Sequence, residues 1–143
     1  MKVSAKAEYA CVAMMELAAN PSDSQPLRIK AIADVHAISP RFLVQVLLQL
    51  KTAGLVASVR GAAGGYQLAR PPEQISLADI LNAVEDRAQG LPTGLRRDTT
   101  PAARTLINVW KDLQTEEQRY LERLTLAELL RRSRHTMELT YQI

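Results

Sequence analysis

Cysteine is almost absent from this sequence, with Cys11 alone among 143 residues. One cysteine cannot form an internal disulfide and cannot hold a metal ion by itself, so neither kind of cross-link is expected. Aromatic residues make up only 4% of the chain, so the core must be built from Ala, Leu, Val and Ile. Together with only six glycines, this composition favours helices.

Long apolar runs are missing as well. No stretch of eighteen apolar residues occurs, which argues against a membrane-spanning helix. The N-terminal residues lack the apolar core of a secretory signal. We therefore expect a cytoplasmic protein without a membrane partner.

Positive charge is present but unevenly distributed. The net charge of the chain is only +3, yet residues 28–70 carry six Lys or Arg against Asp34 alone, a net charge of +5. Residues 71–143 carry ten basic and eleven acidic residues, a net charge of −1. This asymmetry indicates an anionic partner for the first part of the chain, although solvated basic faces are common.

Capping and turn signals divide the chain into helices and one hairpin. Ser4, Ser39-Pro40, Ser76 and Thr100-Pro101 are typical helix starts, because a hydroxyl can accept a bond from a free backbone N–H. Apolar spacing predicts helices over about 4–19, 28–36, 40–52, 77–87 and 101–124, then a short helix from Leu126 that frays after Arg134. Strands over 55–60 and 66–69 flank the glycine-rich turn 61–65.

The order helix, helix, tight turn, helix, hairpin over residues 4–70 predicts a mainly α fold, a winged helix-turn-helix head with a two-stranded wing. In that arrangement the N-terminal residues of the second helix of the pair reach base edges in the major groove. Ser39, Arg41 and Gln45 stand there, where Arg can bind guanine and Gln adenine. By periodicity alone, an ordinary surface helix in a small bundle fits equally well.

The hairpin favours the DNA-binding interpretation. Arg60 stands at the base of a turn nearly free of side chains, and glycines let a backbone approach a phosphate or minor groove closely. An ordinary hairpin with a solvated Arg does not explain why the wing directly follows a helix-turn-helix. The candidate DNA-contacting residues are Arg28, Ser39, Pro40, Arg41, Gln45, Ser58, Arg60, Gly61, Gly64, Gly65 and Tyr66.

Particular residues make the sequence resemble the Rrf2 family of bacterial transcriptional regulators. The most specific stretch runs from Ala53-Gly54-Leu55-Val56 through Ser58 and Arg60-Gly61 to Gly64-Gly65-Tyr66. Supporting matches are Tyr9-Ala10, Ile32-Ala33, Ile38-Ser39, Phe42-Leu43, Leu50, Leu68-Ala69-Arg70-Pro71, Ile75-Ser76-Leu77 and Ala83-Val84-Glu85. The resemblance implies a homodimer on a palindromic operator, with the third helix in the major groove and the wing in the minor groove.

Two departures from the family pattern matter. Val44 stands where family members often have a Glu that helps discriminate bases, so operator preference should differ. Many members also hold an iron–sulfur cluster through three cysteines in the loop after the fourth helix, and the matching loop, residues 88–103, has none. Because thiolates are the cluster ligands, we expect a cluster-free protein with no cofactor and no metal site.

The long helix predicts a dimer contact. Leu106, Trp110, Leu113, Tyr120 and Leu124 follow spacings of three and four, typical of a coiled-coil seam that Glu117 interrupts. Packing against the chain's own head is the alternative, but a small head leaves little room for it. We thus expect a DNA-binding domain over 1–87, a loop over 88–100, a dimerisation helix over 101–124 and a short helix with a tail over 125–143.

Other functions have less support in the sequence. The loop with Arg87, Arg96 and Arg97 occupies the family's sensor position and could take an anionic effector or a protein, although a plain surface loop fits too. An enzyme is not expected, since no catalytic set or phosphate loop occurs. The remaining alternative is a winged-helix module that controls, or is controlled by, a partner enzyme. Operator sequence and the choice between repressor and activator stay open.

Overall fold

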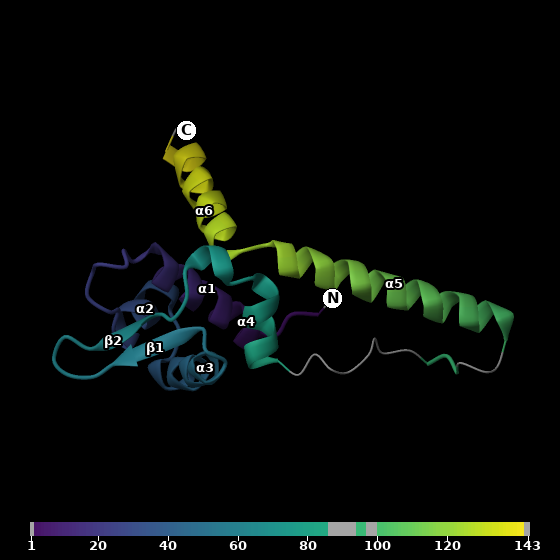
Figure 1. Cartoon of the computed structure of the whole chain (residues 1–143), viewed down its shortest axis with the longest axis horizontal. Coiled ribbons are helices and arrows are strands. Elements are labelled where there is room, and N and C mark those ends of the chain that lie inside the picture. The colour runs from purple at the N-terminus through teal and green to yellow at the C-terminus, as the bar shows by residue number, and fades with distance from the viewer. Residues whose placement is uncertain (1, 86–93, 97–99, 142–143) are drawn as a thin grey trace.

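The computed structural model describes residues 2–85, 94–96 and 100–141. A head is built by α1 (Ala5–Ala19), α2 (Ile29–His36), α3 (Pro40–Thr52), β1 (Val56–Val59), β2 (Gly65–Leu68), the 3-10 turn η1 (Pro72–Gln74) and α4 (Leu77–Val84). From this head α5 (Pro101–Arg123) projects outward, and α6 (Leu126–Tyr141) begins where α5 meets the head and points in another direction (Figure 1). The expected mainly α fold with a two-stranded wing is confirmed.

Helix starts follow the capping signals, with one exception. The hydroxyls of Ser4, Thr100 and Thr125 each accept a hydrogen bond from the backbone N–H three residues later. Ser76 and Asp79 form a capping box, each side chain bonded to the other's backbone N–H. The capping bond predicted for Ser39 is not formed, because the exposed hydroxyl at the start of α3 accepts no N–H of that helix.

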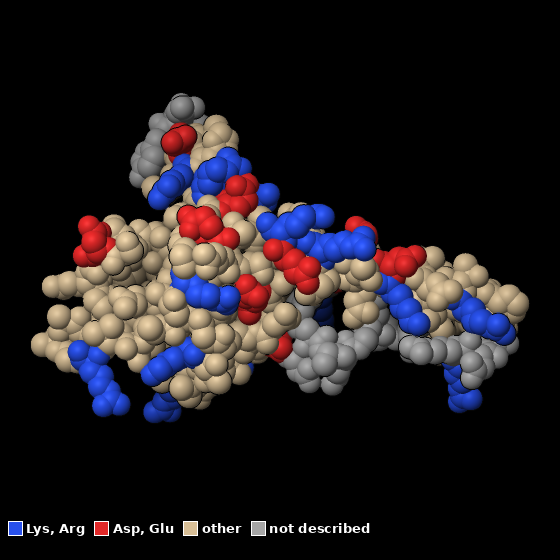
Figure 2. Space-filling view, viewed as in Figure 1, with Lys and Arg blue, Asp and Glu red and all other residues tan. Residues whose placement is uncertain are grey.

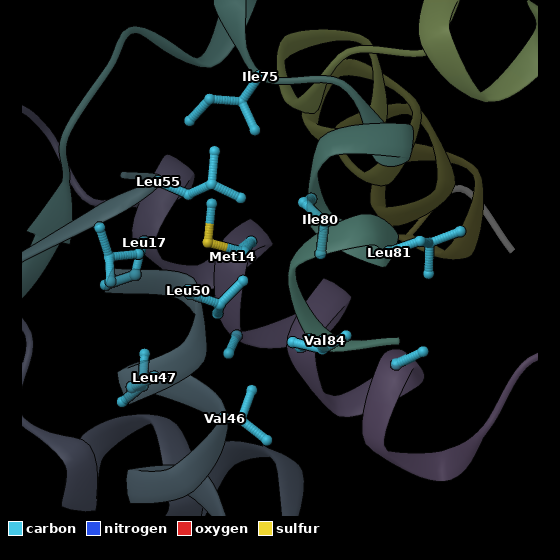
Figure 3. Close-up of a cluster of buried hydrophobic side chains, with 14 of the residues drawn as sticks. Met14, Leu17, Val46, Leu47, Leu50, Leu55, Ile75, Ile80, Leu81 and Val84 are labelled. Atoms are coloured by element: carbon cyan, nitrogen blue, oxygen red, sulfur yellow. The ribbon is translucent and has the colours of Figure 1, made fainter. Parts of the chain in front are cut away.

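The core is aliphatic, as the shortage of aromatic residues predicted. α1 packs against α3, α4 and α6, and the buried side chains of these helices meet in one cluster. In Figure 3, Met14 and Leu17 of α1 lie among Leu47 and Leu50 of α3, with Ile80 of α4 opposite. At the edge of this cluster, the Tyr9 ring meets Phe42 edge-on with centroids 5.6 Å apart, which helps to hold α3 against α1.

Several predicted boundaries are wrong. β1 ends at Val59 rather than residue 60, and β2 spans Gly65–Leu68 rather than residues 66–69. Three further differences have a clear physical reason. β1 starts after Leu55, since the Leu55 N–H bonds the Leu50 carbonyl and closes α3 instead. α4 ends at Val84 rather than residue 87, because Glu85 is extended and its carboxylate accepts bonds from the Ser4 N–H and hydroxyl. α6 continues to Tyr141 rather than fraying after Arg134, since residues 126–141 contain no glycine or proline to stop it.

The start of α4 and the start of α6 lie side by side. The Leu77 N–H donates to the Leu124 carbonyl at 2.8 Å, and the Leu126 N–H donates to the Ile75 carbonyl at 2.9 Å. This short antiparallel pair places the end of α5 against the head. We call it the junction, residues 75–77 and 124–126.

In the part of the chain that the structure describes, no single helix is long and apolar enough to cross a membrane. α2 and α3 meet that criterion only as a pair, and this pair is bent by 117°.

Candidate nucleic-acid interface

The helix pair α2 and α3 has the geometry of a helix-turn-helix. Its two axes differ by 117°, within the range typical of that motif. The turn works because Ala37 adopts a left-handed conformation at φ 52° and the Ile38 N–H bonds the Ala33 carbonyl. Ile38 is buried beneath the turn, so the start of α3 is held at a fixed angle to α2.

The two faces of α3 differ sharply. Leu43, Val46, Leu47 and Leu50 are buried. The opposite face is exposed and carries Pro40, Arg41, Val44, Gln45 and Leu48. Ser39 is exposed immediately before it. The structure therefore presents the candidate base-reading residues Arg41 and Gln45 together, one helical turn apart on the outer surface.

The wing is a short antiparallel hairpin in which Val56 pairs with Leu68 and Val59 with Gly65. Arg60 follows β1 directly and is exposed. Gly61 is exposed at φ +104° with open space around it, so it serves the turn through its backbone conformation.

Gly64 has a different role from the one predicted. It is buried, and a Cβ there would stand 2.9 Å from the carbonyl carbon of Arg60 and closer still to the Val59 oxygen. The absence of a side chain at Gly64 is thus required by the hairpin itself. A buried residue cannot offer its backbone to DNA, so we remove Gly64 from the candidate contacts.

Backbone pairing holds the wing against the start of α2. The Tyr66 N–H donates to the Leu27 carbonyl at 2.7 Å, and the Leu27 N–H donates back to the Tyr66 carbonyl at 2.9 Å. β2 is therefore paired on both sides. Arg28, which follows Leu27 and precedes α2, is exposed beside the wing. Gly65 makes this close approach possible, since a Cβ there would meet the Leu27 carbonyl group.

Lys51 adds a further positive charge beside α3 and the wing. The Lys51 ammonium donates to the Ser58 hydroxyl at 2.7 Å, which ties the end of α3 to β1. Sequence reasoning assigned Ser58 but missed Lys51, although Lys51 belongs to the basic stretch already counted. All six Lys and Arg of residues 28–70 are exposed, and in Figure 2 basic side chains without acidic neighbours project from the lower edge of the head, below the wing and α3.

The apolar stripe predicted on the long helix is exposed for most of its length. Leu106, Trp110, Leu113 and Tyr120 all lie on the surface of α5, and Val109 extends the stripe. Leu124 does not belong to it. It lies in the junction, buried, because α5 ends at Arg123 and the chain turns back to the head there.

The remaining candidate sites carry little chemistry. Arg87 and Arg97 lie outside the described residues, and Arg96 is exposed. A half-open cavity of about 550 Å³ lies elsewhere, where the end of α1 and the following loop face β2 and η1, lined among others by Leu17, Leu68 and Arg70. Among the described residues, no three His, Cys, Asp or Glu side chains gather in a metal-binding group.

Cys11 is a poor ligand in the folded chain. It lies half-buried in α1, and burial, together with the charges of Glu85 and Glu8, raises the pKa of its thiol to about 11. A thiol that stays protonated is neither a metal ligand nor a nucleophile at neutral pH.

Comparison with known proteins agrees with this geometry. The Rrf2 family model, described as an iron-dependent transcriptional regulator, matches residues 3–132. The HTH-type transcriptional regulator IscR of Cereibacter sphaeroides is 34% identical over 136 residues, covering 92% of this chain and 88% of that protein. The solved structure of T. potens IscR, also 34% identical, matches with a TM-score of 0.74 over 93% of this chain and 88% of that one. CymR, the global cysteine regulator of B. subtilis, matches at 34% identity with a TM-score of 0.73, covering 91% of this chain and 96% of that one.

Proposed function

Because the chain belongs to the Rrf2 family of transcriptional regulators, we propose that it acts as a homodimer on a palindromic DNA operator, without an iron–sulfur cluster. The observation that carries this proposal is the single exposed face on which the start of α3, Arg28 and the wing are held together. A bacterial chromosome lies in the cytoplasm, which is where we place its action.

The groups on this face suit the two grooves of a duplex. Arg41 and Gln45 on the outer side of α3 have the donors and acceptors that read guanine and adenine in the major groove. Arg60 stands where the wing can reach the narrow minor groove, whose negative potential attracts Arg. Arg28 and Lys51 flank these residues as phosphate contacts, which set register without reading sequence.

The proposed dimer uses the apolar stripe on α5. A soluble chain rarely leaves a contiguous apolar stripe exposed, so a second copy is the natural cover. Two heads joined this way would meet successive major grooves about 34 Å apart, and a two-fold assembly reads a palindrome. We expect Trp110→Asp to give a folded monomer with weak operator binding, whereas Thr115→Asp on the opposite side of α5 should stay dimeric. Size-exclusion chromatography with light scattering would measure this, and a dimeric Trp110→Asp would refute the assignment.

The residues present do not fit an iron–sulfur cluster. Cluster ligation takes several thiolates, and this sequence has one cysteine, whose raised pKa keeps it protonated. Anaerobically purified protein should lack a visible absorption band, and an iron-dependent band would overturn this part of the proposal. An anionic effector bound near Arg87, Arg96 and Arg97 stays a prediction.

Selection of duplexes from a random library, followed by binding titrations, tests the function. Affinity should fall steeply with salt, because each phosphate contact releases counterions. Arg28→Ala, which removes a proposed phosphate contact, should lower the slope of log affinity against log salt by about 2, one contact from each protomer. Arg41→Ala should cost about 1–3 kcal/mol and relax preference at one base position. Salt-independent binding, or full affinity in both variants, would instead favour a module that docks a partner protein.

A further inference from the structure

We call the exposed outer side of α3 that carries Arg41 and Lys51 the cationic face. Two aliphatic side chains on this face do not belong to the hydrophobic core. Val44 is 44% exposed and Leu48 is 60% exposed, and both lie on the outer side of α3. They are four residues apart, so they lie one above the other on the helix surface. Four residues rise about 6 Å along the helix, close to two base-pair steps of about 3.4 Å. The rise between the two side chains thus matches a separation of about two base-pair steps.

Their surroundings indicate what covers them. Arg41 and Gln45 share the same outer face, and Lys51 follows one turn beyond. No acidic residue occurs anywhere in residues 35–70. An apolar protein partner, or a second copy of this face, would leave these cations facing one another or unpaired. A polyanion neutralises them, and the DNA operator proposed above is such a partner.

A duplex offers one apolar group in its major groove, the 5-methyl group of thymine. We propose that Val44 and Leu48 each contact a thymine methyl, so that the recognised half-site carries thymines about two steps apart beside the bases read by Arg41 and Gln45. This inference rests on the proposed function and adds a base identity to it. Leu48 escaped the sequence analysis, although its spacing from Val44 and Arg41 would have placed it on that face.

Replacing thymine by uracil removes only the methyl group, which makes a direct test. Wild-type protein is titrated against the selected duplex with each thymine changed singly to deoxyuridine. We expect about a fourfold loss of affinity at two positions of a half-site, the factor that corresponds to burying one methyl-sized group. In Val44→Ala and Leu48→Ala, the uracil effect should disappear, at one position each.

The controls separate this effect from folding and from general DNA binding. Both variants change side chains that are already exposed, so their circular dichroism melts should match the wild type. Leu139→Ala removes a similarly exposed leucine from α6, above the head and far from the wing in Figure 1, and should leave the uracil response intact.

Three outcomes decide the matter. Loss at two thymines, abolished by the matching variant, supports the proposal. Equal affinity for thymine and uracil duplexes at every position overturns it, even where the alanine variants bind weakly, and salt-dependent binding then still upholds the proposed function. Failure to select any duplex overturns both.

Discussion

The bond between the wing and the start of α2 yields a sharp prediction at Gly65. An alanine Cβ at this position would stand 2.7 Å from the carbonyl carbon of Leu27, and closer still to its oxygen. Real side chains do not tolerate such a distance to backbone atoms, so Gly65→Ala must push the Leu27 segment away from β2. The paired hydrogen bonds between Leu27 and Tyr66 are the first to be lost.

The magnitude follows from the two ways in which the chain can respond. If the bridge opens, two backbone hydrogen bonds are lost at about 0.5–1.5 kcal/mol each. If the bridge holds, the overlap must be absorbed as strain of about 1–3 kcal/mol. These costs are alternatives of about 1–3 kcal/mol, and the positive φ of Gly65, +155°, adds backbone strain to either of them, so the free energy of unfolding should fall by at least that amount. For a chain of this size that corresponds to a Tm lower by roughly 3–12 °C.

Thermal denaturation by circular dichroism measures the loss, and hydrogen exchange locates it. In Gly65→Ala the amides of Leu27 and Tyr66 should exchange faster, and affinity for the operator should fall because Arg28 and Arg60 no longer keep their spacing. Gly61→Ala is the matched control. It has open space around the added Cβ and loses only about 1–2 kcal/mol through its positive φ, with both amides still protected. Unchanged protection and an unchanged Tm in Gly65→Ala would refute the reasoning.

Three further predictions concern stability and reactivity. Ser76→Ala removes a capping bond and should lower the free energy of unfolding, measured by urea titration, by about 1 kcal/mol. Ser22→Ala, in an exposed loop, should change it little, and equal effects of the two variants would contradict the capping box. Leu126→Ala leaves a cavity at a fully buried site and should lower the free energy of unfolding by about 2–5 kcal/mol in the same assay. Leu139→Ala, at an exposed site, should lower it by less than about 0.5 kcal/mol. Similar losses in the two variants would mean that the junction is not packed. At pH 8, iodoacetamide should alkylate Cys11 about a hundredfold more slowly in the folded protein than in urea, because its pKa is raised from 9.0 to about 11. Comparable alkylation rates in folded and urea-unfolded protein would show an accessible thiolate. The stability that comes from the neutral Cys11 thiol is fully present below pH 9 and is lost as pH rises through about 11.

Local signals predicted most of the fold. Ser4, Ser76 and Thr100 mark their helix starts because a cap depends on residues within one turn of each other, which a sequence displays directly. Ser39 shows the limit of this logic. Its position at the start of α3 was predicted correctly, but the rotamer of an exposed hydroxyl depends on surroundings that the local pattern does not contain.

Long-range contacts account for what was missed. Glu85 reads as part of α4, yet its carboxylate binds Ser4, 81 residues earlier, and α4 stops before it. The sequence suggests an exposed turn glycine at Gly64, but in the fold the backbone at the end of β1 lies against it. Leu124 continues the heptad spacing of α5, yet it is buried in the junction. In each case the deciding neighbour is distant in sequence, so periodicity alone could not identify it.

The junction has a consequence for how a dimer would span DNA. Two backbone bonds, one from Leu77 to Leu124 and one from Leu126 to Ile75, connect the end of α5 to the head within a single turn of chain. These bonds help to set the angle at which α5 leaves the head. In a dimer paired along α5, that angle sets the distance between the two recognition helices. Substitutions in the junction would therefore change half-site spacing in such a dimer, although they lie far from the residues proposed to contact bases.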